Sequence, residues 1–323
     1  MLLNLFEYHW AEHLDDALML LSRTDVKTVP LAGGTYLLGH KDDSIQAVVD
    51  LRDLQLAYIS EDAQSIHIGA MTTLQGMVES PVLKNIASGL LVRAALASSF
   101  SRLIRNSATI GGTLGAWNAA QADLLTALAV MDAAVVMRSG SKTQVNLSGG
   151  TLERPGLSLS GVTYKGKQER RIPFTSFNSE RRPSELIIEI VVPRPVAGCG
   201  ASFMRVGRTP TDVALLNAAC LVQIKDDTYQ RVRLALGGVN MEPVHLQALE
   251  RQLEGQPVMD FASPSQQLMN ALQESMTNFH PPSDFRASNA YRWISGRNLA
   301  YRVFEEATNI ARWQNRIASE GGM

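Results

Sequence analysis

The sequence is short of cysteine, of net charge and of long apolar runs. Cys199 and Cys220 are its only cysteines, and neither has a second cysteine nearby. Because iron–sulfur clusters are held by sets of cysteine thiolates, we expect no cluster in this chain and no disulfide framework. The formal net charge of −1 predicts neither a nucleic-acid partner nor binding to an anionic membrane.

The chain also lacks the marks of export and of membrane insertion. Its N-terminus has neither the basic nor the apolar region of a signal peptide, and no apolar run reaches bilayer length. We therefore expect a cytoplasmic protein without a membrane span. Its 323 residues are enough for two or three domains.

One short motif suggests a metal site but lacks the necessary context. His9-Trp10-Ala11-Glu12-His13 matches the H-x-x-E-H pattern of some zinc peptidases. That site needs both histidines and the glutamate on one helix, whereas the helical pattern here begins only near His13. We predict surface histidines near a helix start and no metal site.

Two distant segments share a Gly-Gly-Thr triplet between apolar residues. Leu31–Leu38 reads Leu-Ala-Gly-Gly-Thr-Tyr-Leu-Leu, and Ile104–Gly115 reads Ile-Arg-Asn-Ser-Ala-Thr-Ile-Gly-Gly-Thr-Leu-Gly after a β-prone run. Glycine allows backbone N–H groups to approach a phosphate closely. Neither segment is a Rossmann fingerprint or a Walker motif. We predict two loops that close on one dinucleotide-like ligand, with hydroxyls from Thr35, Thr109 and Thr113.

The remaining pattern alternates between short strands and helices. Helices are predicted at His13–Ser22, Val82–Ser98, Ala119–Asp132, Val244–Glu254, Ser263–Met276 and Ser288–Glu306. Strands are predicted at Val26–Pro30, Ala47–Leu51, Ser65–Met71, Ala133–Met137, Gln144–Leu147, Leu186–Val192, Ser202–Val206, Val213–Ile224 and Val232–Leu236. Pro193-Arg194-Pro195 marks a linker, and the strands and helices after it predict an α+β domain with an antiparallel meander.

Two features leave alternatives open. Asp123 lies in an apolar helical pattern, where an acid usually occupies the first turn and favours the helix dipole. The alternative is a carboxylate that accepts a hydroxyl of a ligand. Residues 149–183 give no clear pattern, and their basic pairs Arg170-Arg171 and Arg181-Arg182 fit solvated hairpins or a docking patch for an acidic partner.

Further motifs share their order with a known family. They are Val-Val-Asp-Leu-Arg (48–52), Ile-Gly-Ala-Met-Thr-Thr (68–73), Ala-Asp-Leu-Leu-Thr-Ala-Leu (122–128), Glu-Leu-Ile-Ile-Glu-Ile (185–190), Val-Gly-Arg-Thr-Pro-Thr-Asp-Val-Ala (206–214), Leu-Ala-Leu-Gly-Gly-Val (234–239) and Asp-Phe-Arg-Ala-Ser (284–288). With the two glycine segments, they resemble the FAD-binding medium subunit of molybdenum hydroxylases, which include the xanthine dehydrogenase and carbon monoxide dehydrogenase families. The likeness covers nearly the whole chain.

The resemblance implies an α+β fold with two parts. The first is a vanillyl-alcohol-oxidase (PCMH)-type FAD-binding domain, with subdomains at residues 1–60 and 61–195. The second is a C-terminal α+β domain at residues 200–315, with an antiparallel sheet and helices.

The resemblance also implies a set of FAD-binding residues. The pyrophosphate and neighbouring atoms would be held by Leu31, Ala32, Gly33, Gly34, Thr35, Tyr36, Leu37, Leu38, Thr109, Ile110, Gly111, Gly112 and Thr113. Asp123 would hydrogen-bond the cofactor, and Ile188 and Arg205 would lie near the flavin. Thr113 stands where the family usually has Asn, Tyr36 where it has a smaller polar residue, and Arg205 where it has Lys.

The implied function is electron transfer within a complex. A large subunit would carry the molybdenum cofactor, and a small iron–sulfur subunit with two [2Fe-2S] clusters would deliver electrons. FAD in this chain would pass them to NAD, a quinone or oxygen. Two alternatives are a stand-alone FAD oxidase of the same fold and a non-enzymatic assembly subunit that has lost FAD.

Overall fold

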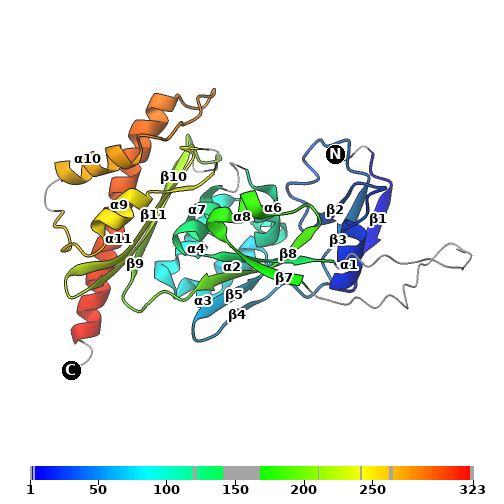
Figure 1. Cartoon of the computed structure of the whole chain (residues 1–323), viewed down its shortest axis with the longest axis horizontal. Helices are drawn as coiled ribbons and strands as arrows, with labels where there is room; N and C mark the ends of the chain where they lie inside the picture. The colour runs from blue at the N-terminus through cyan, green and yellow to red at the C-terminus, as the bar shows by residue number, and fades with distance from the viewer. Residues whose placement is uncertain are drawn as a thin grey trace, which may run out of the picture.

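The structure is a computed structural model that describes residues 2, 4–118, 122–140, 168–209, 211–240, 242–261 and 265–320. Its described strands form three sheets that follow one another along the longest axis of the molecule (Figure 1). We call them the N-terminal, central and C-terminal sheets. The predicted α+β class is confirmed.

The N-terminal sheet has three parallel strands in the order β1-β3-β2. These strands are β1 (Glu7–Trp10), β2 (Thr28–Leu31) and β3 (Ala47–Asp50). Helix α1 (Leu14–Leu21) packs its apolar residues against this sheet. Strand β2 lies at an edge, so Pro30 does not interrupt the ladder. Its end delivers the chain directly into the first Gly-Gly-Thr segment.

The central sheet has the order β4-β5-β8-β6-β7 and only antiparallel pairs. Its strands are β4 (Ile59–Glu61), β5 (Ser65–Gly69), β6 (Ala134–Ser139), β7 (Gln168–Pro173) and β8 (Glu185–Pro193). The helices of this part are α2 (Leu74–Glu79), α3 (Pro81–Lys84), the 3-10 helix η1 (Ala87–Gly89), α4 (Leu90–Ser98), α5 (Arg102–Ser107), α6 (Ile110–Ala116), α7 (Ala122–Val130) and α8 (Phe174–Glu180). One apolar core joins strands β5, β6 and β8 with helices α2, α4 and α7.

The C-terminal sheet is an antiparallel meander in the order β12-β11-β10-β9. It comprises β9 (Gly200–Val206), β10 (Leu216–Lys225), β11 (Thr228–Gly237) and β12 (Val244–His245). Helices α9 (Gln247–Leu253), α10 (Gln266–Ser275) and α11 (Asn289–Glu320) pack against one of its faces. The opposite face packs against α7 and α4, between the C-terminal and central sheets (Figure 1).

The predicted helix Val82–Ser98 is wrong as a single element. Helix α3 ends at Lys84, and α4 begins only at Leu90. Between them Ala87, Ser88 and Gly89 all have positive φ, so the chain changes direction. The apolar period continues across this break, which explains why the pattern alone suggests one helix.

The second Gly-Gly-Thr segment was predicted as a loop after a β-prone run, and this is also wrong. Helix α5 contains the run, and α6 contains both glycines. Two caps explain the helices, since the Ser101 hydroxyl accepts from Ile104 N–H and the Thr109 hydroxyl accepts from Gly112 N–H.

Other differences are smaller. Helix α11 extends to Glu320 instead of ending near Glu306, and strand β12 precedes α9. The predicted strand Gln144–Leu147 lies outside the described residues, and β6 pairs with β7 and β8. Within the described residues, the structure contains no helix with the length and apolarity needed to span a bilayer.

Candidate cofactor site

A cleft of about 960 Å³ lies between the first Gly-Gly-Thr segment, helices α5 and α6, the start of β8 and the β9–β10 connection. Pockets for small ligands and cofactors typically measure ~300–1,000 Å³, so this one suits a large ligand. The segments that line it are far apart in the sequence. All three sheets therefore contribute to one site.

The first Gly-Gly-Thr segment is an open turn with unused donors. The Leu38 amide donates to the Gly34 carbonyl at 3.0 Å and closes the turn. The N–H groups of the five residues from Gly33 to Leu37 donate to no other described residue. Consecutive free amides of this kind form a concave site for an anion.

Two glycines make this turn possible for different reasons. A Cβ on Gly33 would lie 1.6 Å from the Ser107 carbonyl oxygen, because the turn packs directly on the end of α5. Gly34 has φ of +70°, in the left-handed region that glycine adopts without strain. Packing therefore requires glycine at position 33, and backbone conformation favours glycine at position 34.

The second Gly-Gly-Thr segment forms the first turn of α6, and its donors are already used. Ile110 and Gly111 donate their N–H groups to the carbonyls of Thr72 and Ala70, at 3.0 and 2.8 Å. The Gly112 amide donates to the Thr109 hydroxyl at 3.0 Å, and the Thr113 amide to the Thr109 carbonyl. This segment therefore offers surface to a ligand, but none of these four amides.

Only one glycine of this turn faces open space in the cleft. A Cβ on Gly111 would meet the Ala70 carbonyl at 2.7 Å, so Gly111 is required for packing. A Cβ on Gly112 would meet only the Thr109 hydroxyl at 3.0 Å and the Ala32 methyl at 3.9 Å. Gly112 thus keeps the space between the two segments open.

Of the three threonines whose hydroxyls were predicted to contact the ligand, two already use their hydroxyls within the protein. Thr113 donates its hydroxyl to the Thr109 carbonyl at 2.9 Å, and Thr109 is the cap of α6. Thr35 has no hydrogen bond to a described residue and lines the cleft. Tyr36 also lines it, with its ring stacked on that of His40.

A buried ion pair lies at another part of the cleft wall. Asp123, in the first turn of α7, lies with Oδ2 at 3.4 Å from Nε of Arg205 on β9. Asn217 Nδ2 on β10 donates to Asp123 Oδ1 at 2.8 Å. Burial raises the pKa of Asp123, and Arg205 and Asn217 counteract part of this rise. The cleft wall therefore contains one charged group from helix α7 of the FAD-binding part and one from strand β9 of the C-terminal sheet.

A further wall of the cleft comes from residues 97–101 between α4 and α5. Arg105 is buried and holds this wall, because its guanidinium donates to the carbonyls of Ser99 and Phe100 at 2.6 and 2.9 Å. It also donates to Gln75 Oε1 at 2.9 Å. The wall is fixed from behind by hydrogen bonds to its backbone.

Two family models match consecutive parts of the chain. Residues 4–149 match the FAD binding domain in molybdopterin dehydrogenase, and residues 201–307 match the CO dehydrogenase flavoprotein C-terminal domain. Together they account for most of the sequence. The chain belongs to the FAD-binding medium subunits of molybdopterin dehydrogenases, the carbon monoxide dehydrogenase flavoprotein family.

Individual relatives agree over nearly their full length. The glyceraldehyde dehydrogenase medium chain of Sulfolobus acidocaldarius is 27% identical, across 93% of this chain and 98% of its own. The carbon monoxide dehydrogenase medium chain of Afipia carboxidovorans is 26% identical, across 95% and 98%. A solved carbon monoxide dehydrogenase structure from Hydrogenophaga pseudoflava superposes with a TM-score of 0.78 at 22% identity, across 95% and 98%, and supports the fold.

As a flavoprotein subunit of this family, the chain places most of the predicted site residues together. The residues that line the cleft are Ala32, Gly33, Gly34, Thr35, Tyr36, Leu37, Thr109, Gly111, Gly112, Thr113, Asp123 and Arg205. Asp123 lies in the first turn of α7 and also in the cleft wall, so its role toward a ligand hydroxyl stays a prediction.

Four predicted residues do not line the cleft. Leu31 ends strand β2, Leu38 is exposed, and Ile110 is fully buried in the core. Ile188 accepts the Ala70 amide at 3.0 Å through its carbonyl, and its neighbour Ile187 lines the cleft instead. A bulge in the pairing of β8 with β6 surrounds Ile188, which strand alternation could not foresee.

The wall at residues 97–101 was missed by the sequence interpretation, although Arg105 in an apolar stretch was a signal of a buried cation. The H-x-x-E-H motif is split, with His9 on strand β1 and His13 at the N-cap of α1. Among the described residues, no group of three or more His, Cys, Asp or Glu side chains is placed to hold a metal ion.

Proposed function

We propose that this chain is the FAD-binding electron-transfer subunit of a molybdenum-containing dehydrogenase complex. In this proposal it receives electrons from [2Fe-2S] clusters of a small partner subunit. A large partner subunit carries the molybdenum cofactor and acts on the substrate. The FAD passes the electrons to NAD, a quinone or oxygen.

The free amides of Gly33–Leu37 are the observation on which FAD binding rests. They line a cleft whose opposite surface, at Gly112, has no side chain. A pyrophosphate is an anion that accepts hydrogen bonds from such a turn, and the bare glycine lets it approach. The residues present therefore fit an extended dinucleotide with one anionic link.

The rest of the cleft would bind and orient the cofactor. When bound, FAD supplies the two-electron and one-electron chemistry of its ring system. The Asp123–Arg205 pair offers a carboxylate and a guanidinium at one part of the wall. Asn217 donates to Asp123, and Arg205 donates to the Asp212 carbonyl. These groups would hydrogen-bond the cofactor and set its electrostatic surroundings.

The chemistry of the cysteines supports a partner as the source of electrons. Both thiols are free and buried, and burial raises the pKa of Cys199 to about 11 and that of Cys220 well above its usual value. A [2Fe-2S] cluster is held by four cysteine thiolates, and the sequence has only these two cysteines. The clusters would therefore belong to another subunit.

An absorption spectrum and a pull-down test the two halves of the proposal. The purified chain should show a flavin spectrum, and its tagged form should copurify with one iron–sulfur and one molybdenum subunit. A colourless chain that takes up no added FAD would refute cofactor binding and favour the assembly-subunit alternative. A yellow chain that oxidises a substrate without partners would favour the stand-alone oxidase.

The acceptor is tested on the reduced flavoprotein. The flavin is reduced without oxygen and then mixed with NAD, with a soluble quinone or with oxygenated buffer, and one of the three should reoxidise it rapidly. An acceptor that fails to reoxidise it during turnover of the whole complex is thereby excluded.

A further inference from the structure

Helix α7 packs on two strands of the C-terminal sheet and makes the larger part of the junction with the FAD-binding part, to which α4 and η1 add contacts with β9. It packs lengthwise on strands β10 and β11, between the central and C-terminal sheets (Figure 1). Asp123 lies at its N-terminal end, in the cleft wall, and Asp132 lies just beyond its C-terminal end. At a rise of about 1.5 Å per residue, the helix separates these two acids by about 13 Å.

Asp132 is an unfavourable residue for its local position. The helix ends in a Schellman turn, in which Ala133 N–H donates to the Leu128 carbonyl and Asp132 N–H to the Ala129 carbonyl. Asp132 has φ of +49°, where glycine is preferred, and its negative charge lies at the negative end of the helix dipole. Aspartate tolerates this conformation better than most residues, but glycine or asparagine would suit it without the unfavourable charge.

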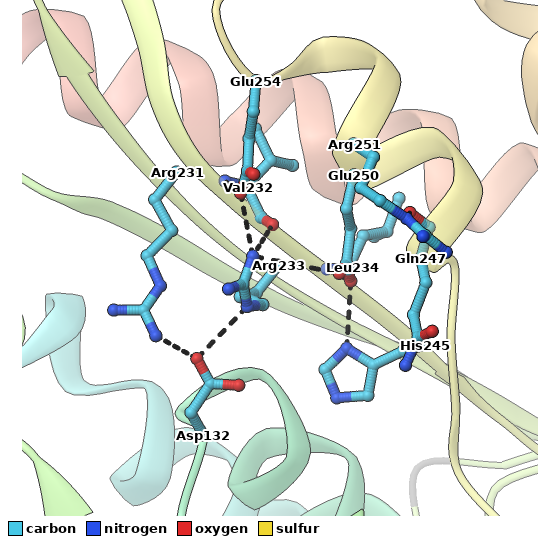
Figure 2. Close-up of polar contacts among 10 residues, drawn as sticks. All are labelled: Asp132, Arg231, Val232, Arg233, Leu234, His245, Gln247, Glu250, Arg251 and Glu254. Atoms are coloured by element: carbon cyan, nitrogen blue, oxygen red, sulfur yellow. Dashed lines mark hydrogen bonds and ion pairs between the residues drawn. The ribbon is translucent and has the colours of Figure 1, made fainter.

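The partners of Asp132 lie on the C-terminal sheet, across the junction with the FAD-binding part. Arg231 Nη2 and Arg233 Nε, both on β11, donate to Asp132 Oδ2, the latter at 3.2 Å (Figure 2). Arg233 also donates to Glu254 Oε1 at 2.8 Å, so its guanidinium is held on the C-terminal side as well (Figure 2). Two cations of the C-terminal sheet thus contact the end of α7, and one of them, Arg233, is itself held by Glu254.

Between the two ends of α7, strand β11 presents few large side chains to the helix. Strand β11 alternates, so that Arg231, Arg233, Ala235 and Gly237 share one face while Val232, Leu234 and Leu236 belong to the core under α9–α11. On β11 the middle of the contact is therefore made by the small residue Ala235, and β10 adds Ala219 and the larger Leu221. The β11 side of this surface buries apolar area but has no large side chain that would fix how far the helix lies along that strand.

The N-terminal end of α7 is the second fixed point. Thr126 donates to Asn217 Oδ1 at 2.6 Å, and Asn217 donates to Asp123. Gly237 permits this close approach, because a Cβ there would lie 2.2 Å from Asn217 Oδ1 and 2.7 Å from the Thr126 hydroxyl. Polar contacts at the two ends of α7 thus add directional constraints on the register of helix and sheet to the apolar packing between them.

We propose that Asp132 is a positioning residue for the cofactor cleft. Through Arg231 and Arg233 it sets the register of the C-terminal sheet on α7, and this register places Arg205 beside Asp123 in the cleft wall. The inference rests on the proposed binding of FAD for its functional consequence. Its structural part concerns this chain alone.

Two substitutions of Asp132 separate positioning from local stability. Asp132→Gly and Asp132→Asn both suit a left-handed position and remove the unfavourable charge, so α7 itself should not be weakened. Both should nevertheless weaken FAD binding by about tenfold, the size of a typical coupling between sites, and change the absorption bands of the bound flavin. Titration of the apoprotein with FAD measures both effects.

Arg231→Met supplies the other side of a double-mutant cycle. Asp132 is the only described partner of its guanidinium, so the pair of substitutions should weaken FAD binding no more than Asp132→Asn alone. Glu61→Gln is the control, since it breaks an exposed ion pair with Arg194 at 3.1 Å that does not cross the junction. It should leave the FAD affinity unchanged.

Hydrogen exchange tests the proposal without any cofactor. In Asp132→Asn, the amides of β9 around Arg205 should exchange faster, while those of α11 keep their wild-type rates. Unchanged exchange in β9, or FAD affinity within about twofold of wild type in both Asp132 variants, would overturn the proposal. If the wild type binds no FAD, the proposed function is wrong, and the exchange rates alone decide whether Asp132 positions Arg205.

Discussion

The two Gly-Gly-Thr segments have the same triplet but opposite backbone states. In Leu31–Leu38 the chain forms an open turn, and five consecutive amides have no acceptor among the described residues. In the segment that begins at Thr109 the chain is helical, and the corresponding amides all have acceptors. The same three residues therefore supply hydrogen-bond donors at one place and a bare surface at the other.

The difference comes from the residues around each triplet. Thr109 precedes its glycines, and its hydroxyl caps the helix at Gly112. Before Gly33 stand Leu31 and Ala32, which have no side chain able to cap, and Gly34 then takes the left-handed conformation. The cap decides which triplet becomes a helix.

Gly33→Ala should reduce the stability of the fold more than any other substitution proposed here, because the first segment packs directly on the end of α5. Its Cβ would lie 1.6 Å from the Ser107 carbonyl, which belongs to the backbone and cannot move away alone. We expect a loss of stability above about 4 kcal/mol and little soluble folded protein. Circular dichroism and yield measure this.

Gly115→Ala is the matched control for that substitution. No described atom lies within 4 Å of its Cβ position, and alanine suits a helix better by roughly 0.5–1 kcal/mol. A Gly33→Ala protein as stable as Gly115→Ala would show that the close packing of the two segments is wrong.

Gly112→Val should abolish FAD retention while leaving the fold intact. The added Cβ would enter the space between Gly112 and Ala32, where the proposed pyrophosphate approaches, at 3.0 Å from the Thr109 hydroxyl and 3.9 Å from the Ala32 methyl. The flavin absorption of the purified variant and its melting temperature measure the two properties. Full occupancy with FAD would contradict the assignment of this surface, and loss of folding would mean that the substitution tests packing instead.

Sequence reasoning recovered the composition of the cleft better than its geometry. Glycine pairs near apolar runs identified both segments, because a position that cannot accommodate a Cβ must be glycine and is therefore visible in the sequence. The pattern could not show that Gly111 serves packing on Ala70 while Gly112 faces the ligand space. That distinction depends on contacts between residues about forty positions apart.

The C-terminal sheet was predicted well for a physical reason. Its strands alternate between two buried faces and are joined by short connections, so local pattern and tertiary structure agree. Arg205 and Asp123 meet only because α7 packs across this sheet, and nothing in either local sequence encodes that meeting. The resemblance to the family, and not periodicity, placed them in one site.

Thr109→Val should have a moderate effect that sharpens the comparison. It removes the cap of α6 and leaves the Gly112 amide without its acceptor, at a cost of about 1 kcal/mol. For a domain of this size the melting temperature should fall by about 2–4 °C. Thr109→Ser keeps the hydroxyl and should remain close to wild type, whereas equal destabilisation by Ser and Val would show that the cap contributes nothing.

Asp42 should give the smallest effect, and it acts on only one of the two segments. The Ser44 hydroxyl and amide, with Lys27, lower the pKa of Asp42 to about 2, just beyond the turn at Gly33–Leu37. A lowered carboxyl pKa stabilises the fold at pH values above the ordinary pKa near 3.8, and this contribution is lost as the pH falls toward the pKa of the folded state.

Residues 109–113 contain no ionisable side chain. The amides of Leu38, Gly39 and His40 donate within the open turn, to the carbonyls of Gly34 and Tyr36. Their exchange should therefore be slower in wild type than in Asp42→Asn at about pH 5, with the difference shrinking below about pH 3. Exchange at residues 109–113 should match in the two proteins throughout, and an equal response of both segments would show that Asp42 affects global stability instead of the open turn.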